Sequence, residues 1–114
     1  MTTPTLNPLS NEWFLTGEWQ EEVESITAKK DARLSLLYSA RDVYLVLSGE
    51  GTIKVLVDGK TVDVLEISGK DSIAGSVQVT KDSLYHLVHE KSFQKNRLLE
   101  LEFSPGVRAF AFTF

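Results

Sequence analysis

The residues that most often carry chemistry are few in this chain, and the two histidines come first. His86 and His89 are three residues apart in the segment SLYHLVHE. Side chains of a strand alternate between its two faces, so this spacing predicts that the two imidazoles point to opposite sides. A metal ion needs ligands that converge on one point. The spacing therefore predicts no metal site, and we expect surface or edge histidines instead.

Nucleophilic and redox chemistry has little support in the sequence. None of the 114 residues is a cysteine, which excludes a disulfide, a thiolate nucleophile, a zinc–thiolate site and an iron–sulfur cluster. Serine is abundant, but no Gly-x-Ser-x-Gly elbow marks one serine as activated. The pair Gly49-x-Gly51 is too short for a dinucleotide-binding fingerprint and precedes a predicted strand rather than a helix. We therefore expect no catalytic residue and no cofactor.

The acidic residues are scattered along the chain and form no recognisable calcium-binding loop. A structural Ca²⁺ held by loop carboxylates and carbonyls stays open as an alternative. Glycoside hydrolysis would need two carboxylates about 5–10 Å apart across a cleft, and 114 residues are few for a sandwich with a substrate cleft. Solvated strand faces and loops are the favoured interpretation of these carboxylates.

The remaining candidates for ligand binding are aromatic. Four residues, Trp13, Trp19, Tyr44 and Tyr85, each combine a flat apolar face with a polar edge, which suits stacking on a sugar or filling a pocket of a partner. Arg41, beside Asp42 at the start of an apolar run, is the fifth candidate. Packing in the core is the competing role for every aromatic candidate, above all for Trp19 and Tyr44. Trp13, nearest the start of the chain, is the best candidate for exposure.

Composition and charge exclude several classes of protein. Lys plus Arg total 12 and Asp plus Glu total 16, so the net charge at pH 7 is −4 and the basic excess of a nucleic-acid-binding protein is absent. Apolar residues make up 42% and charged residues 25%, an ordinary globular mixture. No apolar run approaches the roughly 20 residues of a membrane span, so we expect no direct membrane insertion. The first residues show no signal peptide, which suggests a cytosolic protein or a domain excised from a longer chain.

The elements that must position these side chains are predicted to be strands. Apolar and polar residues alternate in 31–40, in Thr52–Val57 and in Leu98–Phe103, and no stretch sustains a helical period over three turns. The run VYLVL at 43–47 is apolar on both sides, as in a central strand covered on two faces. Asp58-Gly59 is a signal for a two-residue hairpin.

This rhythm predicts an all-β domain, a jelly-roll-like antiparallel β-sandwich of about eight to ten strands. Residues 1–11 are expected to form a flexible lead-in, in which Pro4 and Pro8 break regular pairing, and 12–114 a single domain. The predicted strands cover approximately 13–19, 22–27, 32–40, 42–48, 52–58, 61–67, 76–80, 83–89, 97–104 and 107–114.

Three segments together resemble a known family. They are GEW-x2-E at Gly17–Glu22, LSLLYSARDVYLVLSGEGTIKVLVDGK at Leu34–Lys60 and LLELEFSPGVRAFAFTF at Leu98–Phe114. They are similar to the C-terminal β-sandwich of DipZ-like proteins, in which this module follows a thioredoxin-like domain. One departure is Asn96-Arg97-Leu98, where such proteins often have a His-x-Leu pattern, so any role of that histidine is not carried over.

The resemblance implies a non-catalytic accessory module, similar to carbohydrate-binding modules and placed outside the cytoplasm in its parent protein. Its expected partners are a carbohydrate or a protein, above all the neighbouring thioredoxin-like domain. The alternative is a purely structural role, in packing or as a homodimer joined through strand edges, because the final strand is strongly apolar. An enzyme such as a glycosidase is a third and weaker hypothesis.

Overall fold

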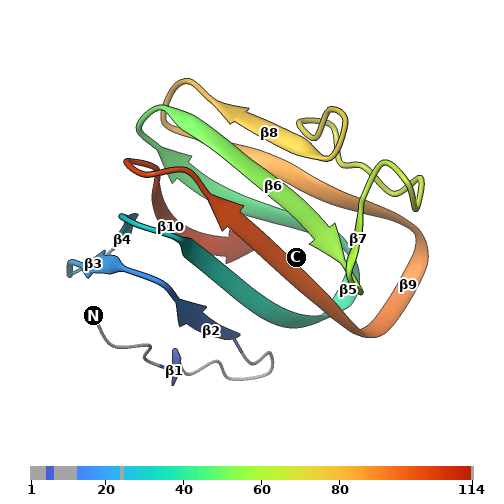
Figure 1. The fold of residues 1–114 in the computed structure, drawn as a ribbon. Coiled ribbons are helices and arrows are strands. Elements are labelled where there is room, and N and C mark those ends of the chain that lie inside the picture. The colour runs from blue at the N-terminus through green and yellow to red at the C-terminus, as the bar shows by residue number, and fades with distance from the viewer. Residues whose placement is uncertain (1–4, 7–12, 24, 114) are drawn as a thin grey trace.

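The computed structural model describes residues 5–6, 13–23 and 25–113, and this part of the chain contains strands and no helix (Figure 1). The strands are β1 (Thr5–Leu6), β2 (Trp13–Thr16), β3 (Trp19–Glu21), β4 (Ile26–Ala28), β5 (Ala32–Ser48), β6 (Gly51–Val57), β7 (Lys60–Thr61), β8 (Ser76–Val79), β9 (Ser83–Phe103) and β10 (Arg108–Thr113). All of their pairings are antiparallel, which confirms the prediction of an antiparallel all-β domain.

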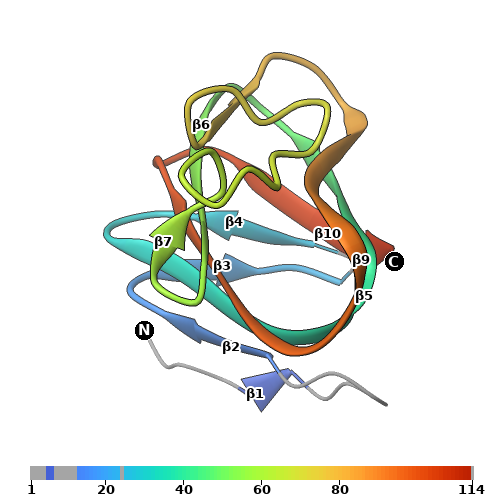
Figure 2. The same cartoon turned by 90° about the vertical axis from the view of Figure 1, so that its right-hand side faces the viewer.

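Two long strands, β5 and β9, organise the fold. They pair with each other from Ala32↔Phe103 to Leu47↔Ser83, and both bend sharply near their middle (Figures 1 and 2). The main path of the sheet is β3-β4-β10-β5-β9-β6-β7. Because β5 and β9 bend, this one sheet folds over into two facing layers. The first half of β5 pairs with β2 and the second half with β10, so each half belongs to a different layer.

Period-two alternation explains which side chains fill the space between the layers. The predicted inward positions of all three alternating segments are buried, among them Leu34, Ile53 and Leu99. The two faces of 43–47 differ from the prediction, because Tyr44 and Val46 are only half-buried. That run is covered fully on its inner face alone.

Strand boundaries depart from the sequence prediction where the long strands bend. The predicted pairs 32–40 with 42–48, and 83–89 with 97–104, are each one continuous strand. The predicted strand 61–67 is wrong, because β7 ends at Thr61 and the chain continues in turns. The amide of Leu65 donates to the carbonyl of Thr61 at 3.3 Å, which closes one of these turns.

Two local predictions concern turns and the start of the chain. Asp58 and Gly59 both have positive φ, 52° and 85°, between β6 and β7, as the Asp-Gly hairpin signal predicts. Within the expected lead-in, Thr5–Leu6 pair with Trp13–Phe14, so regular pairing does occur between the two prolines. The rest of 1–11 lies outside the described residues.

Candidate functional site

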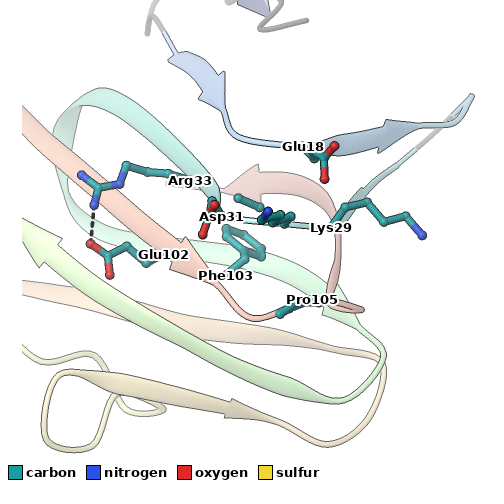
Figure 3. A pocket seen from close by; sticks show the side chains of 9 residues that line it. Glu18, Lys29, Asp31, Arg33, Glu102, Phe103 and Pro105 are labelled. Atoms are coloured by element: carbon teal, nitrogen blue, oxygen red, sulfur yellow. Dashed lines mark hydrogen bonds and ion pairs between the residues drawn. The ribbon is translucent and has the colours of Figure 1, made fainter. Parts of the chain in front are cut away.

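A groove of about 690 Å³ opens at one end of the domain, where three connections meet (Figure 3). One connection joins β2 to β3, the second joins β4 to β5, and the third joins β9 to β10. The lining residues are Glu18, Lys29, Lys30, Asp31, Ala32, Arg33, Glu102, Phe103 and Pro105.

Backbone geometry explains the first wall of the groove. Gly17 has a φ of 81°, and a side chain at this position would overlap the carbonyl oxygen of Asp31. This close approach lets the amide of Glu18 donate to the carbonyl of Lys30 and the amide of Lys29 donate to the carbonyl of Glu18, both at 2.9 Å. The GEW segment therefore joins the β2–β3 turn to the β4–β5 turn.

An aromatic pair lies under the groove. Phe103 meets Trp19 edge to face, with ring centroids 4.9 Å apart, and the Trp19 indole N–H donates to the carbonyl of Thr16 at 2.8 Å. Both residues are buried, with exposed fractions of 6% for Phe103 and 1% for Trp19. Pro105 is exposed at the rim. The floor is apolar, but it offers little ring area to a ligand.

Charged groups of both signs line the rim. Arg33 is held in the groove by Glu102 at 2.5 Å and by Glu100 at 3.3 Å. Lys29 and Lys30 are exposed and take part in none of the ion pairs found between described residues. The carboxylates of Glu18 and Asp31 are also exposed and outside these ion pairs, so the rim presents two ammonium groups and two carboxylates for contact with a partner. The sequence reasoning missed these lysines, whose only signal was the charged run KKD at 29–31.

The predicted aromatic candidates do not gather in this groove. The structure places Trp19 and Tyr85 in the core, which was the competing role, and neither ring presents a face to solvent. The Tyr85 hydroxyl donates to the carbonyl of Lys81 at 2.7 Å. Trp13 belongs to β2 and pairs with Leu36, but its side chain lies outside the described residues.

The other two candidates, Tyr44 and Arg41, meet at a second place, on β5. The half-buried Tyr44 ring stacks on His86 with centroids 4.4 Å apart and an interplanar angle of 18°. Arg41 is exposed and its Nε lies 3.3 Å from Asp42 Oδ2. Both are thus neighbours of a cluster that contains the histidines.

The predicted divergence of the two histidines is wrong. Asp42 Oδ1 lies 3.0 Å from His86 Nε2 and 2.6 Å from His89 Nδ1, so both rings reach the same carboxylate. The hydrogen bond from His89 lowers the pKa of Asp42 below its ordinary value, and those from His86 and Arg41 act in the same direction.

A β-bulge is the physical reason for this convergence. The register between β5 and β9 shifts between Val43↔Val88 and Tyr44↔His86, so Leu87 is an extra residue in β9. Leu87 and Val88 are both fully buried, although neighbours in a regular strand face opposite sides. One inserted residue returns His86 and His89 to the same outer face. Two adjacent apolar residues between the histidines were the one available signal.

Comparison with known proteins agrees with the family resemblance. A family model described as "Thioredoxin like C-terminal domain" matches residues 3–114. Proteins called "Protein DipZ" from Mycobacterium bovis and Mycobacterium tuberculosis are each 32% identical to this chain over 106 residues, or 92% of it. The chain spans only 13% of the length of these relatives. The match over nearly every residue shows that this chain belongs to the family of thioredoxin-like C-terminal domains, as found in DipZ-like proteins.

Proposed function

We propose that this domain is a non-catalytic accessory module that binds a partner through the groove, beside a thioredoxin-like domain of the same parent protein. The carrying observation is the groove itself, with a buried aromatic floor and a rim of charges, two of which are lysines outside any described ion pair. The family membership supports the accessory role. By the same resemblance, the proposed location is outside the cytoplasm.

A protein segment suits this groove better than a carbohydrate. Sugar recognition by stacking needs an exposed aromatic face, and Phe103, the aromatic residue among the lining residues, is 6% exposed. Charges of both signs around an apolar centre are instead typical of the rim of a protein interface. The exposed lysines would meet carboxylates of the partner. Carbohydrate binding through hydrogen bonds to the same rim is the second version of the proposal.

The first experiment is a titration of the ¹⁵N-labelled domain, followed by NMR. The titrants are the separately produced thioredoxin-like domain of the parent protein and, in another arm, soluble oligosaccharides of the bacterial cell wall. We expect the thioredoxin-like domain to shift amide signals of 17–18, 29–33 and 102–106. Shifts by sugars at the same amides would favour the carbohydrate version, and no shift by either titrant would contradict the proposal.

A charge-reversal pair tests the role of the rim. The double variant Lys29→Glu/Lys30→Glu should weaken binding of the thioredoxin-like domain about tenfold or more, because it replaces attraction by repulsion at the rim. The matched control is Lys60→Glu/Lys95→Glu, which makes the same change in net charge at exposed positions that do not line the groove. Equal loss in both variants would indicate an unspecific effect of charge.

The structural alternative, packing or dimerisation without a ligand, predicts self-association. Phe93 on β9 and Phe110 on β10 are exposed by 60% and 38%, and each is an apolar side chain through which two copies could associate. Sedimentation velocity over a hundredfold range of protein concentration distinguishes self-association from a monomeric, partner-binding domain. A monomer throughout would remove the homodimer version.

A further inference from the structure

We propose that Asp42, His86 and His89 form a binding site for a divalent transition-metal ion, with Zn²⁺ and Cu²⁺ as the best-suited ions. The site is separate from the groove and does not depend on the proposed partner binding. The two residues 86 and 89 are the only histidines in the chain, and the bulge in β9 brings both to one carboxylate.

The positions of the donor atoms carry the proposal. One donor atom from each of the three residues lies within 4.8 Å of the donor atoms of the other two. His86 Nε2 and His89 Nδ1 are the nitrogens that contact Asp42 Oδ1. Ligand atoms about 2.0–2.2 Å from a tetrahedral Zn²⁺ are about 3.3–3.6 Å apart, so the contacts of 3.0 and 2.6 Å from Asp42 to the two histidines must lengthen when an ion enters. A small adjustment of side-chain torsions would let the three atoms surround one ion.

The surroundings hold two of the three ligands in place. The side chains of His86 and Asp42 are only 16% and 20% exposed. Tyr44 stacks on the His86 ring, and Arg41 contacts the second oxygen of Asp42. His89 is 52% exposed, so an ion can enter from solvent on its side. Ordered ligands reduce the conformational entropy that binding removes.

The donor chemistry selects the class of ion. Two imidazoles and one carboxylate suit Zn²⁺, Cu²⁺ and Ni²⁺, whereas Ca²⁺ and Mg²⁺ prefer six or more oxygen ligands. Three ligands from the protein leave at least one position of the ion to water. We therefore expect binding of Zn²⁺ and Cu²⁺ and no competition from Mg²⁺.

The hydrogen bonds of His86 supply a spectroscopic signature. The amide of Lys70 donates to His86 Nδ1 at 3.2 Å, so in the metal-free protein the neutral ring carries its proton on Nε2 and donates it to Asp42. A metal bound to Nε2 requires the proton to be on Nδ1 instead. The contact with Lys70 must then open, which lowers the affinity but makes the change of tautomer diagnostic of Nε2 coordination.

The test is isothermal titration calorimetry of the metal-free chain with ZnCl₂ and, separately, with CuCl₂, in a buffer that does not coordinate metals. We expect one ion per chain, and binding about tenfold or more weaker in His89→Ala and in Asp42→Asn. Asp82→Asn, which removes an exposed carboxylate outside the cluster, is the matched control and should bind as the parent chain does. His89 is half-exposed, so its variant should keep the fold, which circular dichroism checks.

NMR of the imidazole nitrogens provides the second measurement. Stoichiometric Zn²⁺ should move the His86 proton from Nε2 to Nδ1 and shift the amide of Lys70. The proposal is overturned if neither ion binds saturably, if His89→Ala and Asp42→Asn bind Zn²⁺ as tightly as Asp82→Asn, or if the His86 tautomer is unchanged at full occupancy.

Discussion

At the scale of single residues, the carboxylate of Glu90 is the most consequential buried charge. It is 2% exposed, and it accepts hydrogen bonds from the Tyr38 hydroxyl at 2.7 Å and from Arg97 Nε and Nη2 at 2.9 and 3.0 Å. Arg97 also contacts Asp58 in the hairpin turn at 2.9 Å. A charge buried this deeply is tolerated only when its hydrogen-bonding capacity is filled. The network links the middle of β9 to the β6–β7 turn.

Removing this carboxylate should destabilise the domain strongly. Glu90→Ala leaves the Tyr38 hydroxyl and part of the Arg97 guanidinium without an acceptor, and loss of one partner of a buried pair costs about 3–5 kcal/mol. Lys91→Ala removes an ion pair with Glu66 whose two side chains are 75% and 78% exposed, and should change stability by less than about 0.5 kcal/mol. Urea denaturation measures both, and similar values for the two variants would contradict the role of the buried network.

Tyr38 gives this network a dependence on alkaline pH. Burial raises the pKa of the Tyr38 hydroxyl well above its ordinary value of 10.0, and the hydrogen bond to Glu90 adds to the rise. A raised pKa in the folded state means that the stabilisation is complete below about pH 10 and is lost as pH rises above it, because only the unfolded chain then ionises. Tyr38→Phe should be less stable at pH 7 by about 1–3 kcal/mol and lose less stability between pH 9 and 11. If the free energies of unfolding of the parent chain and of Tyr38→Phe fell by the same amount between pH 9 and 11, this prediction would be wrong.

Residue types alone could locate only part of the two candidate sites. The chemistry of the aromatic side chains suits ligand binding, but the alternation of their segments also predicts that some face the core, as Trp19 does. The convergence of His86 and His89 depends on one bulged residue, and pairing register is a tertiary property that no short pattern specifies. No sequence motif identifies the groove lysines, because the groove forms only where three connections, distant in sequence, come together in the folded chain.

At the scale of elements, two turn glycines allow the cost of a left-handed backbone conformation to be measured separately from the cost of steric overlap. Gly17 and Gly59 have similar φ values, 81° and 85°, but a side chain at Gly17 would overlap the carbonyl of Asp31, whereas nothing lies within 4 Å of one at Gly59. Gly59→Ala should cost about 1–2 kcal/mol from the left-handed conformation alone. Gly17→Ala should cost at least about 2 kcal/mol more, because the β2–β3 turn must move away from the β4–β5 turn. Thermal unfolding of both variants measures the difference, and equal losses would show that the turn relaxes freely.

Alternation and turn signals predicted most strands, and they failed at specific elements. The predicted strand 13–19 is divided between β2 and β3, and the predicted strand 22–27 is wrong over its first half, because β4 begins only at Ile26. Strands such as β6 and β8 were found within one residue of their predicted ends, since one face of each is buried and their flanking turns are marked. The bends of β5 and β9 were predicted as strand ends because polar residues interrupt the pattern there. The apolar residues of 61–67 are spaced nearly as in a strand. In the structure, however, Val62 and Ile67 are buried in the core from a segment of consecutive turns.

At the scale of the whole molecule, both layers share one hydrophobic core. The cluster of buried side chains extends from Leu15 on β2 to Ala109 on β10 and includes residues of both long strands. Because β5 and β9 belong to both layers, one layer cannot unfold while the other keeps its central strands. Equilibrium unfolding should therefore be two-state, with coincident transitions by far-ultraviolet circular dichroism and by tryptophan fluorescence. Separated midpoints would indicate that the layers are independent units.

The same topology predicts slow folding. The pairing of β5 with β9 joins Ala32 to Phe103, residues separated by 103 − 32 = 71 positions, and the pairing of β5 with β10 joins Ser48 to Arg108. Such contacts require closure of long loops before they stabilise the chain, so we expect folding in milliseconds to seconds rather than microseconds. Stopped-flow refolding from urea, followed by tryptophan fluorescence, measures the rate. Leu99 is buried and pairs with Leu36, so Leu99→Ala should slow folding if the β5–β9 pairing forms in the transition state. Val79→Ala on the peripheral strand β8 is the matched control and should mainly accelerate unfolding. Slower folding in Val79→Ala but not in Leu99→Ala would mean that the periphery forms first and that the long strands close last.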